Sequence, residues 1–107
     1  MGETRFEVVL TEHAWRDLEE IDNYWTERQE AWRGEKYYGD LRAAAQQELG
    51  DPATARRGRS ARDCDFAGVQ EILVFGTYRI LYQINPALGR VEVLHFWHSH
   101  RAPPRFD

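Results

Sequence analysis

Cysteine is almost absent from this chain of 107 residues, in which Cys64 is the single example. One thiol cannot form a disulfide within the chain, so we expect a reducing, cytoplasmic environment and interpret Cys64 as an inert small residue. Long apolar runs are also missing. No stretch is long enough to cross a bilayer, and the N-terminal residues MGETRFEVVL lack the layout of a signal peptide, so we expect no membrane partner.

The chain has the composition of one globular domain, which we place over residues 1–107: 42% of the residues are hydrophobic, 30% are charged and four are tryptophan. Its charge is divided unevenly. Residues 1–51 carry thirteen acidic and six basic side chains, whereas residues 52–107 carry five acidic side chains and eight arginines. The basic second half indicates a face that meets an anionic partner, although charges that only solvate two surfaces would give the same division.

The first half of the chain predicts one strand followed by two helices. Residues 5–10 (RFEVVL) are short and β-branched, as in a strand, and Thr11 follows as a helix N-cap. Apolar residues then recur at helical spacing in two stripes, and Gly34 between them is the expected helix break. The stripes are Ala14, Leu18, Ile21 and Trp25, then Tyr38, Leu41, Ala45 and Leu49.

Three further expectations concern the helices. Asp17 lies off the first stripe, so we expect it to face water. A close helix–helix crossing would explain Gly39 inside the second helix, and Gly50 followed by Pro52 is expected to end that helix.

The second half predicts an irregular basic loop over residues 53–66 and then strands over residues 69–75, 78–84 and 91–97. The short turns between the strands make them antiparallel neighbours. The last strand is apolar on both faces, with Val91, Val93 and Trp97 on one and Leu94 and Phe96 on the other, so we expect it inside the sheet with the first strand beside it. The predicted fold is α+β with two layers, in which the helical hairpin covers one face of a mostly antiparallel sheet and the other face keeps a groove.

The segments LTEHAWRDLEEIDNYW, GTYRILYQI and RVEVLHFWHSHRAPP, in this order and spacing, resemble the RelE/ParE superfamily of toxins from type II toxin–antitoxin pairs. The resemblance covers nearly the whole chain and implies a compact two-layer fold and a cognate antitoxin whose flexible segment wraps the toxin. We expect no cofactor. It leaves two activities open. RelE-like members cut messenger RNA on the ribosome, whereas ParE-like members block DNA gyrase.

Metal-independent RNA cleavage needs a proton donor and acceptor and cations that hold the phosphate. Histidine and arginine have these properties, so His98 or His100 is the candidate acid or base, and Arg79 and Arg101 are the candidate phosphate ligands. Alternation along its strand predicts Arg79 on the open face. The histidines could equally be solvated loop residues. We interpret His95 as a structural, hydrogen-bonded ring, and the histidine spacing does not fit a zinc site.

The arginines of the basic loop have two interpretations, since they could bind phosphate or an acidic antitoxin segment. They are Arg56, Arg57, Arg59 and Arg62. Arg62 also lies near a position where RelE-like toxins carry a catalytic arginine. Among the aromatic residues, core positions are expected for Trp25, Tyr38 and Tyr82, while Trp15 and Trp32 are candidate partner contacts.

Several departures from RelE-like nucleases favour the ParE-like activity. The C-terminal tail offers Phe106 where those nucleases often have a tyrosine, and Lys36 is the single lysine of a chain whose pI is about 5.5. An acidic protein suits RNA poorly because phosphate contacts dominate such affinity. The long predicted hairpin is also more like ParE. The sequence therefore favours a ParE-like inhibitor of a host protein, with a RelE-like ribonuclease as the alternative.

Overall fold

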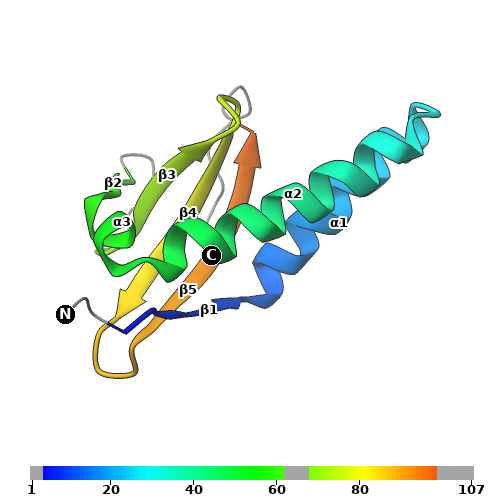
Figure 1. Ribbon diagram of the computed structural model, residues 1–107. Helices are drawn as coiled ribbons and strands as arrows, with labels where there is room; N and C mark the ends of the chain where they lie inside the picture. Colours follow the sequence, from blue (N-terminus) through cyan, green and yellow to red (C-terminus); the bar gives the residue numbers. More distant parts are fainter. Residues whose placement is uncertain (1–3, 62–67, 99–107) are drawn as a thin grey trace.

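The computed structural model describes residues 4–61 and 68–98, and Figure 1 shows the order of their elements. A short strand leads into two long helices, a short third helix and four further strands. The bounds are β1 Glu7–Leu10, α1 Glu12–Glu27, α2 Ala31–Gly50, α3 Pro52–Arg57, β2 Arg59–Ser60, β3 Gln70–Val74, β4 Tyr78–Asn85 and β5 Arg90–His98.

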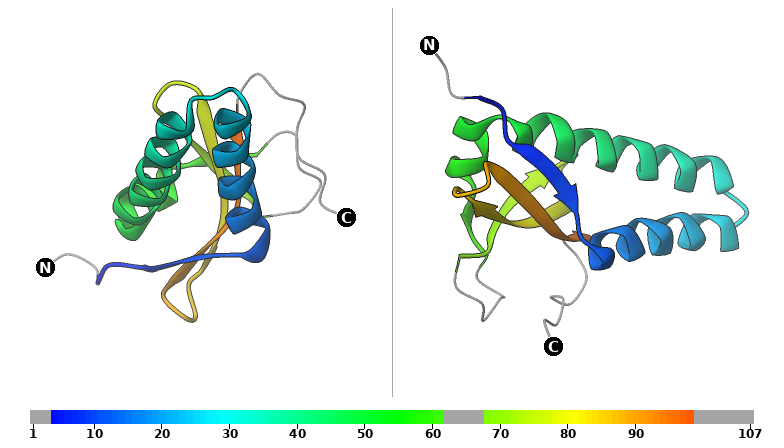
Figure 2. Two further views of the ribbon diagram at one scale, coloured as in Figure 1. Left: turned by 90° about the vertical axis from the view of Figure 1, so that its right-hand side faces the viewer. Right: turned by 90° about the horizontal axis from the view of Figure 1, so that it is seen from below.

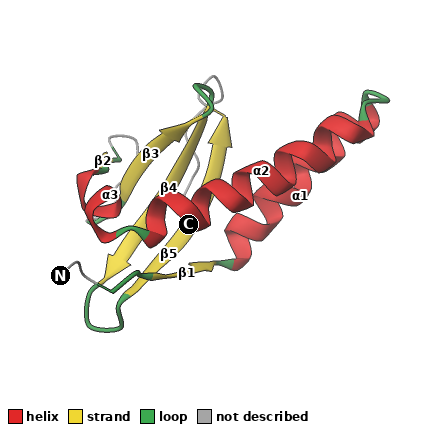
Figure 3. Cartoon of the chain, in the orientation of Figure 1, coloured by secondary structure: helices red, strands yellow, loops and turns green. Residues whose placement is uncertain are grey.

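The strands form one sheet in the order β1-β5-β4-β3-β2, which is antiparallel except that β1 runs parallel to β5 (Figure 3). β5 therefore lies inside the sheet with β1 beside it, as the sequence predicts. The helices α1 and α2 form an antiparallel hairpin on one face. The predicted α+β class and the two-layer arrangement are confirmed.

The helical hairpin packs on the sheet with its base and extends beyond the sheet with its tip (Figure 2). Thr11 begins α1 as predicted, because its Oγ1 accepts a hydrogen bond from the backbone N–H of Ala14 and donates one to the carbonyl oxygen of Val93. Five side chains of the two predicted stripes are completely buried: Ala14, Leu18, Leu41, Ala45 and Leu49. An α2 of 20 residues is about 30 Å long, and its first turns lie in the part of the hairpin that extends beyond the sheet (Figure 2).

The sequence predicted the turn between the helices at Gly34, and this prediction is wrong. The turn lies at Arg28–Glu30, where Gln29 takes the left-handed conformation with φ 61°. Gly34 instead lies in α2 where the two helices approach closely. A Cβ atom there would lie 2.4 Å from Oδ1 of Asp22 and 2.7 Å from its carbonyl oxygen. Gly39, where we expected the close crossing, has open space around it, so that expectation is wrong.

Residues 53–66 are not simply a loop, since the described part forms α3 and β2. Asp51 caps α3 by accepting a hydrogen bond from the backbone N–H of Ala53 at 3.1 Å, and Pro52 occupies the first helical turn, where its missing N–H costs nothing. Gly50 and Pro52 therefore mark the end of α2, as predicted, but Pro52 also begins the next helix.

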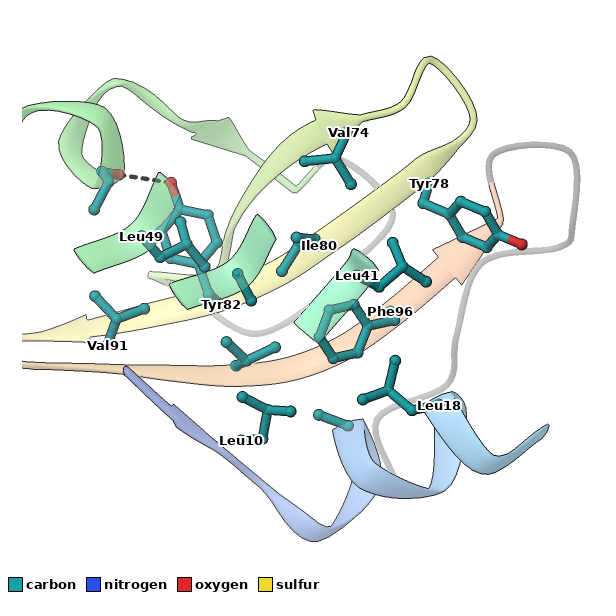
Figure 4. Close-up of a cluster of buried hydrophobic side chains, with 14 residues drawn as sticks. Leu10, Leu18, Leu41, Leu49, Val74, Tyr78, Ile80, Tyr82, Val91 and Phe96 are labelled. Carbon is teal, nitrogen blue, oxygen red and sulfur yellow. Dashed lines mark hydrogen bonds between the residues drawn. The ribbon is translucent and has the colours of Figure 1, made fainter. Parts of the chain in front are cut away.

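A buried tyrosine connects α3 to the centre of the sheet. Tyr82 of β4 is completely buried, as predicted, and its hydroxyl donates a 2.6 Å hydrogen bond to the carbonyl oxygen of Ala55 (Figure 4). Burial raises the pKa of Tyr82 to about 12, because the phenolate would lose its hydration, although a backbone hydrogen bond from Gly58 opposes this change. A Cβ atom at Gly58 would lie 1.8 Å from the Tyr82 hydroxyl, so this position accepts only glycine without movement.

A β-bulge changes the faces that we predicted for β5. Leu81 pairs with His95 but Tyr82 pairs with Val93, which leaves Leu94 as the extra residue. Val91, Val93 and Phe96 consequently join the core under the helices, while Leu94 and Trp97 pack with the smaller cluster on the other face. The predicted grouping of Trp97 with Val93 is therefore wrong.

Asp17 is buried, so the expectation that it faces water is also wrong. β1 ends before β5 does, and the carboxylate of Asp17 meets the edge of β5 that β1 leaves unpaired. Its Oδ2 accepts hydrogen bonds from the backbone N–H of Phe96 at 3.1 Å and from the His95 ring at 2.8 Å. His95 is buried and hydrogen-bonded, which confirms its structural interpretation.

In the part of the chain that the structure describes, no helix is long and apolar enough to cross a membrane.

Candidate functional site

The face of the sheet opposite the helices, which we call the open face, carries an ion-pair network centred on Glu71. Oε2 of Glu71 accepts a 2.6 Å hydrogen bond from Nε of Arg79, and a second nitrogen of the same guanidinium also contacts it. Oε1 lies 3.1 Å from Nε of Arg59. The side chains of Glu71 and Arg79 are only 6% and 12% exposed. Glu71 therefore compensates the charge of Arg79 and fixes its guanidinium among partly buried neighbours.

Arg79 lies on the open face, as strand alternation predicts, but His98 does not. The register pairs Tyr78 with His98 and Arg79 with Trp97, so His98 shares the helix-covered face with Tyr78. Their rings meet edge to face, with centroids 5.3 Å apart. Two residues that the nuclease interpretation groups, Arg79 and His98, therefore extend from opposite faces of the sheet.

Three of the predicted site residues lie outside the described residues: Arg62, His100 and Arg101.

The basic side chains of α3 and β2 are exposed. The guanidinium of Arg56 lies over the ring of Phe6, 5.5 Å from its centroid. Nε of Arg57 donates to the carbonyl oxygen of Ala53 at 3.2 Å, and Arg59 reaches Glu71. The structure thus gathers Arg56, Arg57 and Arg59 on one short segment.

A groove of about 890 Å³ separates α2 from β3. Its α2 side includes Asp40 and Glu48, and Arg57 and Arg59 lie among the residues that line it. β2 pairs only with the first two residues of β3, so within the described chain the outer edge of β3 has no strand partner from Ile72 onward. Leu73 and Phe75, at 54% and 57% exposure, add apolar surface beside this unpaired edge.

The sequence reasoning did not identify Glu71, Leu73 or Phe75. A signal for Glu71 was present, because it is a charged residue within the apolar segment VQEILVF, next to a strand that carries Arg79. An isolated carboxylate in such a strand needs a partner when it is buried. The unpaired edge of β3 had no comparable signal, since the length of β2 is not evident from the residues.

Among the described residues, no group of three or more histidine, cysteine, aspartate or glutamate side chains is arranged to hold a metal ion.

Comparison with known proteins places this fold among toxin–antitoxin proteins. Residues 8–103 match the family model described as the ParE toxin of the type II toxin–antitoxin system parDE. The toxin–antitoxin complex RelBE2 from Mycobacterium tuberculosis contains a chain with 24% identity and a TM-score of 0.64, and the match covers 88% of this chain and 98% of that one. The chromosomal ParDE system from P. aeruginosa contains a chain with 14% identity and a TM-score of 0.68, with 92% and 100% covered. Among curated proteins there is no match.

Proposed function

This chain belongs to the ParE toxin family of type II toxin–antitoxin systems, and we propose that this toxin component acts by binding a host protein, with DNA gyrase as the first candidate, and not by cutting RNA. A cognate antitoxin neutralises it. The alternative is a ribosome-dependent ribonuclease of the RelE type.

The arrangement of Arg79 is the observation that carries this proposal. A ribonuclease needs its phosphate-holding cation free to move onto the substrate and its acid or base within hydrogen-bond reach of the same bond. Arg79 is instead held by the buried carboxylate of Glu71, and His98 extends from the opposite face. To use Arg79, a phosphate would have to displace Glu71 and leave that carboxylate buried without its main partner, which is costly.

The charge of the chain supports the same conclusion. The net charge is −4, so the long-range field does not attract ribosomal RNA as a basic protein would. The exposed arginines of α3 and β2 form a local basic segment, which suits an acidic protein segment better than an extended nucleic acid.

We assign the antitoxin to the groove between α2 and β3. The unpaired edge of β3 offers backbone N–H and C=O groups to an extended segment, and Leu73 and Phe75 offer apolar anchors beside it. Arg57 and Arg59 at the groove would pair with acidic side chains of that segment.

Exposed leucines provide a matched test of this assignment. Leu73→Glu should weaken antitoxin binding, measured by calorimetry, by about tenfold or more, because it places a charge against an apolar contact. Leu88→Glu is the control, since Leu88 is 59% exposed in the β4–β5 turn and does not line the groove. Equal effects of the two changes, or no effect of Leu73→Glu, would show that the antitoxin does not bind in this groove.

The activity itself is tested with a double variant, His98→Ala together with His100→Ala. If the toxin binds a protein, the variant should still inhibit growth when it folds with wild-type circular dichroism, and a translating extract should keep its messenger RNA intact. Defined messenger cleavage by the wild type that disappears in the folded double variant would favour the ribonuclease.

A further inference from the structure

A second cleft, of about 360 Å³, lies where the helical hairpin leaves the sheet, and Trp97 from the face of Arg79 lines it together with Tyr78 and His98 from the helix-covered face. Its volume falls at the small end of the roughly 300–1,000 Å³ typical of ligand sites. We call it the aromatic cleft, because seven of its lining residues carry aromatic rings: Tyr24, Trp25, Tyr37, Tyr78, Phe96, Trp97 and His98. None of the antitoxin groove residues lines it.

The rings of the aromatic cleft form a connected series from the hairpin to the sheet. Trp25 stacks on Tyr37 with centroids 5.7 Å apart, and Tyr37 meets Tyr78 at 5.8 Å. Figure 4 shows Tyr78 at the end of the buried cluster, with its hydroxyl directed away from the core. This series gives the cleft a rigid wall of π surface, because each ring is fixed by the next.

Two carboxylates and the ring of His98 lie among the polar side chains that line the aromatic cleft. Asp17 and Glu20 line the aromatic cleft, and the described lining includes neither lysine nor arginine. Glu20 is exposed, and within the described residues it has no ion-pair partner. The helix that supplies both carboxylates, α1, carries six acidic side chains and one arginine. The exposed carboxylate of Glu20 would therefore attract a cation to the aromatic cleft.

The chain itself shows what kind of cation these rings accept. The guanidinium of Arg28 lies 3.7 Å from the centroid of Tyr24, and that of Arg33 lies 5.3 Å from the centroid of Trp25. A guanidinium is planar, so it stacks on a ring and can still donate paired hydrogen bonds to a carboxylate, whereas a lysine ammonium acts as a point charge. Aromatic rings beside a carboxylate thus favour arginine.

We infer that the aromatic cleft receives an arginine side chain of a partner protein, stacked on the ring wall and paired with Glu20. A macromolecular partner fits because the cleft adjoins exposed aromatic surface on the hairpin, where Tyr24 is 39% and Trp32 is 61% exposed. Tryptophan, tyrosine and arginine are the residues that most often dominate protein interfaces. The inference holds for a protein partner of either toxin activity, so it can fail while the proposed function stands.

The test is a titration of the purified toxin with N-acetyl-arginine amide, followed by the indole N–H signals of Trp25 and Trp97 in NMR spectra at low salt. Both signals should shift saturably, whereas that of Trp15, which does not line the aromatic cleft, should not. The citrulline analogue keeps the shape without the charge and should bind about fivefold more weakly. The norleucine analogue should bind more weakly still.

Two glutamates of α1 provide the variant and its control. Glu20→Gln should weaken the binding of the arginine probe by up to about fivefold, while Glu19→Gln removes the same charge from an exposed neighbour outside the aromatic cleft and should have little effect. The inference is overturned if no saturable binding occurs, if citrulline or norleucine binds as well as arginine, or if the two variants weaken binding equally.

Discussion

Replacing Tyr82 with phenylalanine removes one hydroxyl from the middle of the sheet, and the change should act in opposite directions at neutral and at alkaline pH. At neutral pH the variant loses the hydrogen bond to the carbonyl oxygen of Ala55. That oxygen keeps two longer contacts, from Nε2 of Gln70 at 3.5 Å and from the backbone N–H of Gly58 at 3.4 Å. The free energy of unfolding should therefore fall by only about 1 kcal/mol.

At alkaline pH the variant should become the more stable of the two proteins, because the wild type must keep the Tyr82 hydroxyl protonated to stay folded. Its pKa is about 12 in the folded protein and near its ordinary value of 10 in the unfolded chain. The stabilisation is complete below pH 10 and is lost as the pH rises toward 12, by up to roughly 2.7 kcal/mol. Phenylalanine has no such loss, so the two stabilities should cross near about pH 11.

Urea unfolding of both proteins between about pH 8 and pH 11.5 measures this crossing. The other tyrosines and Lys36 titrate in both proteins, so the difference between the two curves isolates Tyr82. Curves that stay parallel across this range would show that the hydroxyl is not desolvated in the folded protein, and the reasoning about α3 and the sheet would fail with it.

Two further changes test the helix packing and the edge of β5. Gly34→Ala should lower the free energy of unfolding by about 1–3 kcal/mol, because the added Cβ atom would overlap the facing helix. Gly39→Ala should raise it by about 0.5–1 kcal/mol, because that position has open space and alanine is the better helix former. Thermal melts in which Gly34→Ala is the more stable variant would contradict the observed helix crossing. Asp17→Ala should lower the free energy of unfolding by about 2–4 kcal/mol, because it leaves the Phe96 N–H without its acceptor. The control Glu19→Ala changes an exposed residue and should alter stability by less than about 0.5 kcal/mol. Equal losses of stability in urea unfolding would show that the edge of β5 does not need Asp17.

The order of elements could be predicted from the sequence because apolar periodicity and turn residues act locally. Thr11 predicted the start of α1, and the stripe that includes Leu41 and Leu49 predicted the buried face of α2. The position of β5 followed from its apolar character on both faces. These features depend on neighbours within a few residues, so one sequence contains them.

The failures arose where tertiary contacts overrode the local pattern. Asp17 is a charged residue off the apolar stripe, yet it is buried because β1 is shorter than β5 and leaves an N–H group to be satisfied. Because of the bulge at Leu94, the residues after it lie on the faces opposite to those predicted, and no residue type in this segment indicates a bulge. Gly34 was expected at a turn, although its small size instead serves the close approach of two helices.

The candidate site was predicted only in part, because side-chain partners decide it. Strand alternation placed Arg79 correctly on the open face, but it does not reveal that Glu71 holds the guanidinium. The same alternation, once corrected by the register, separates Arg79 from His98. The histidine and arginine types therefore kept a nuclease open as the alternative, and the positions of Arg79 and His98 do not favour it.

The most direct test of the account is to induce this toxin in bacteria and to follow plasmid supercoiling and messenger RNA integrity in the same cultures. A toxin that binds gyrase should change the supercoiling of plasmid DNA within the first phase of growth arrest, while messenger RNA remains full-length. Messenger RNA that is cut at defined codons before any change in supercoiling would contradict the account.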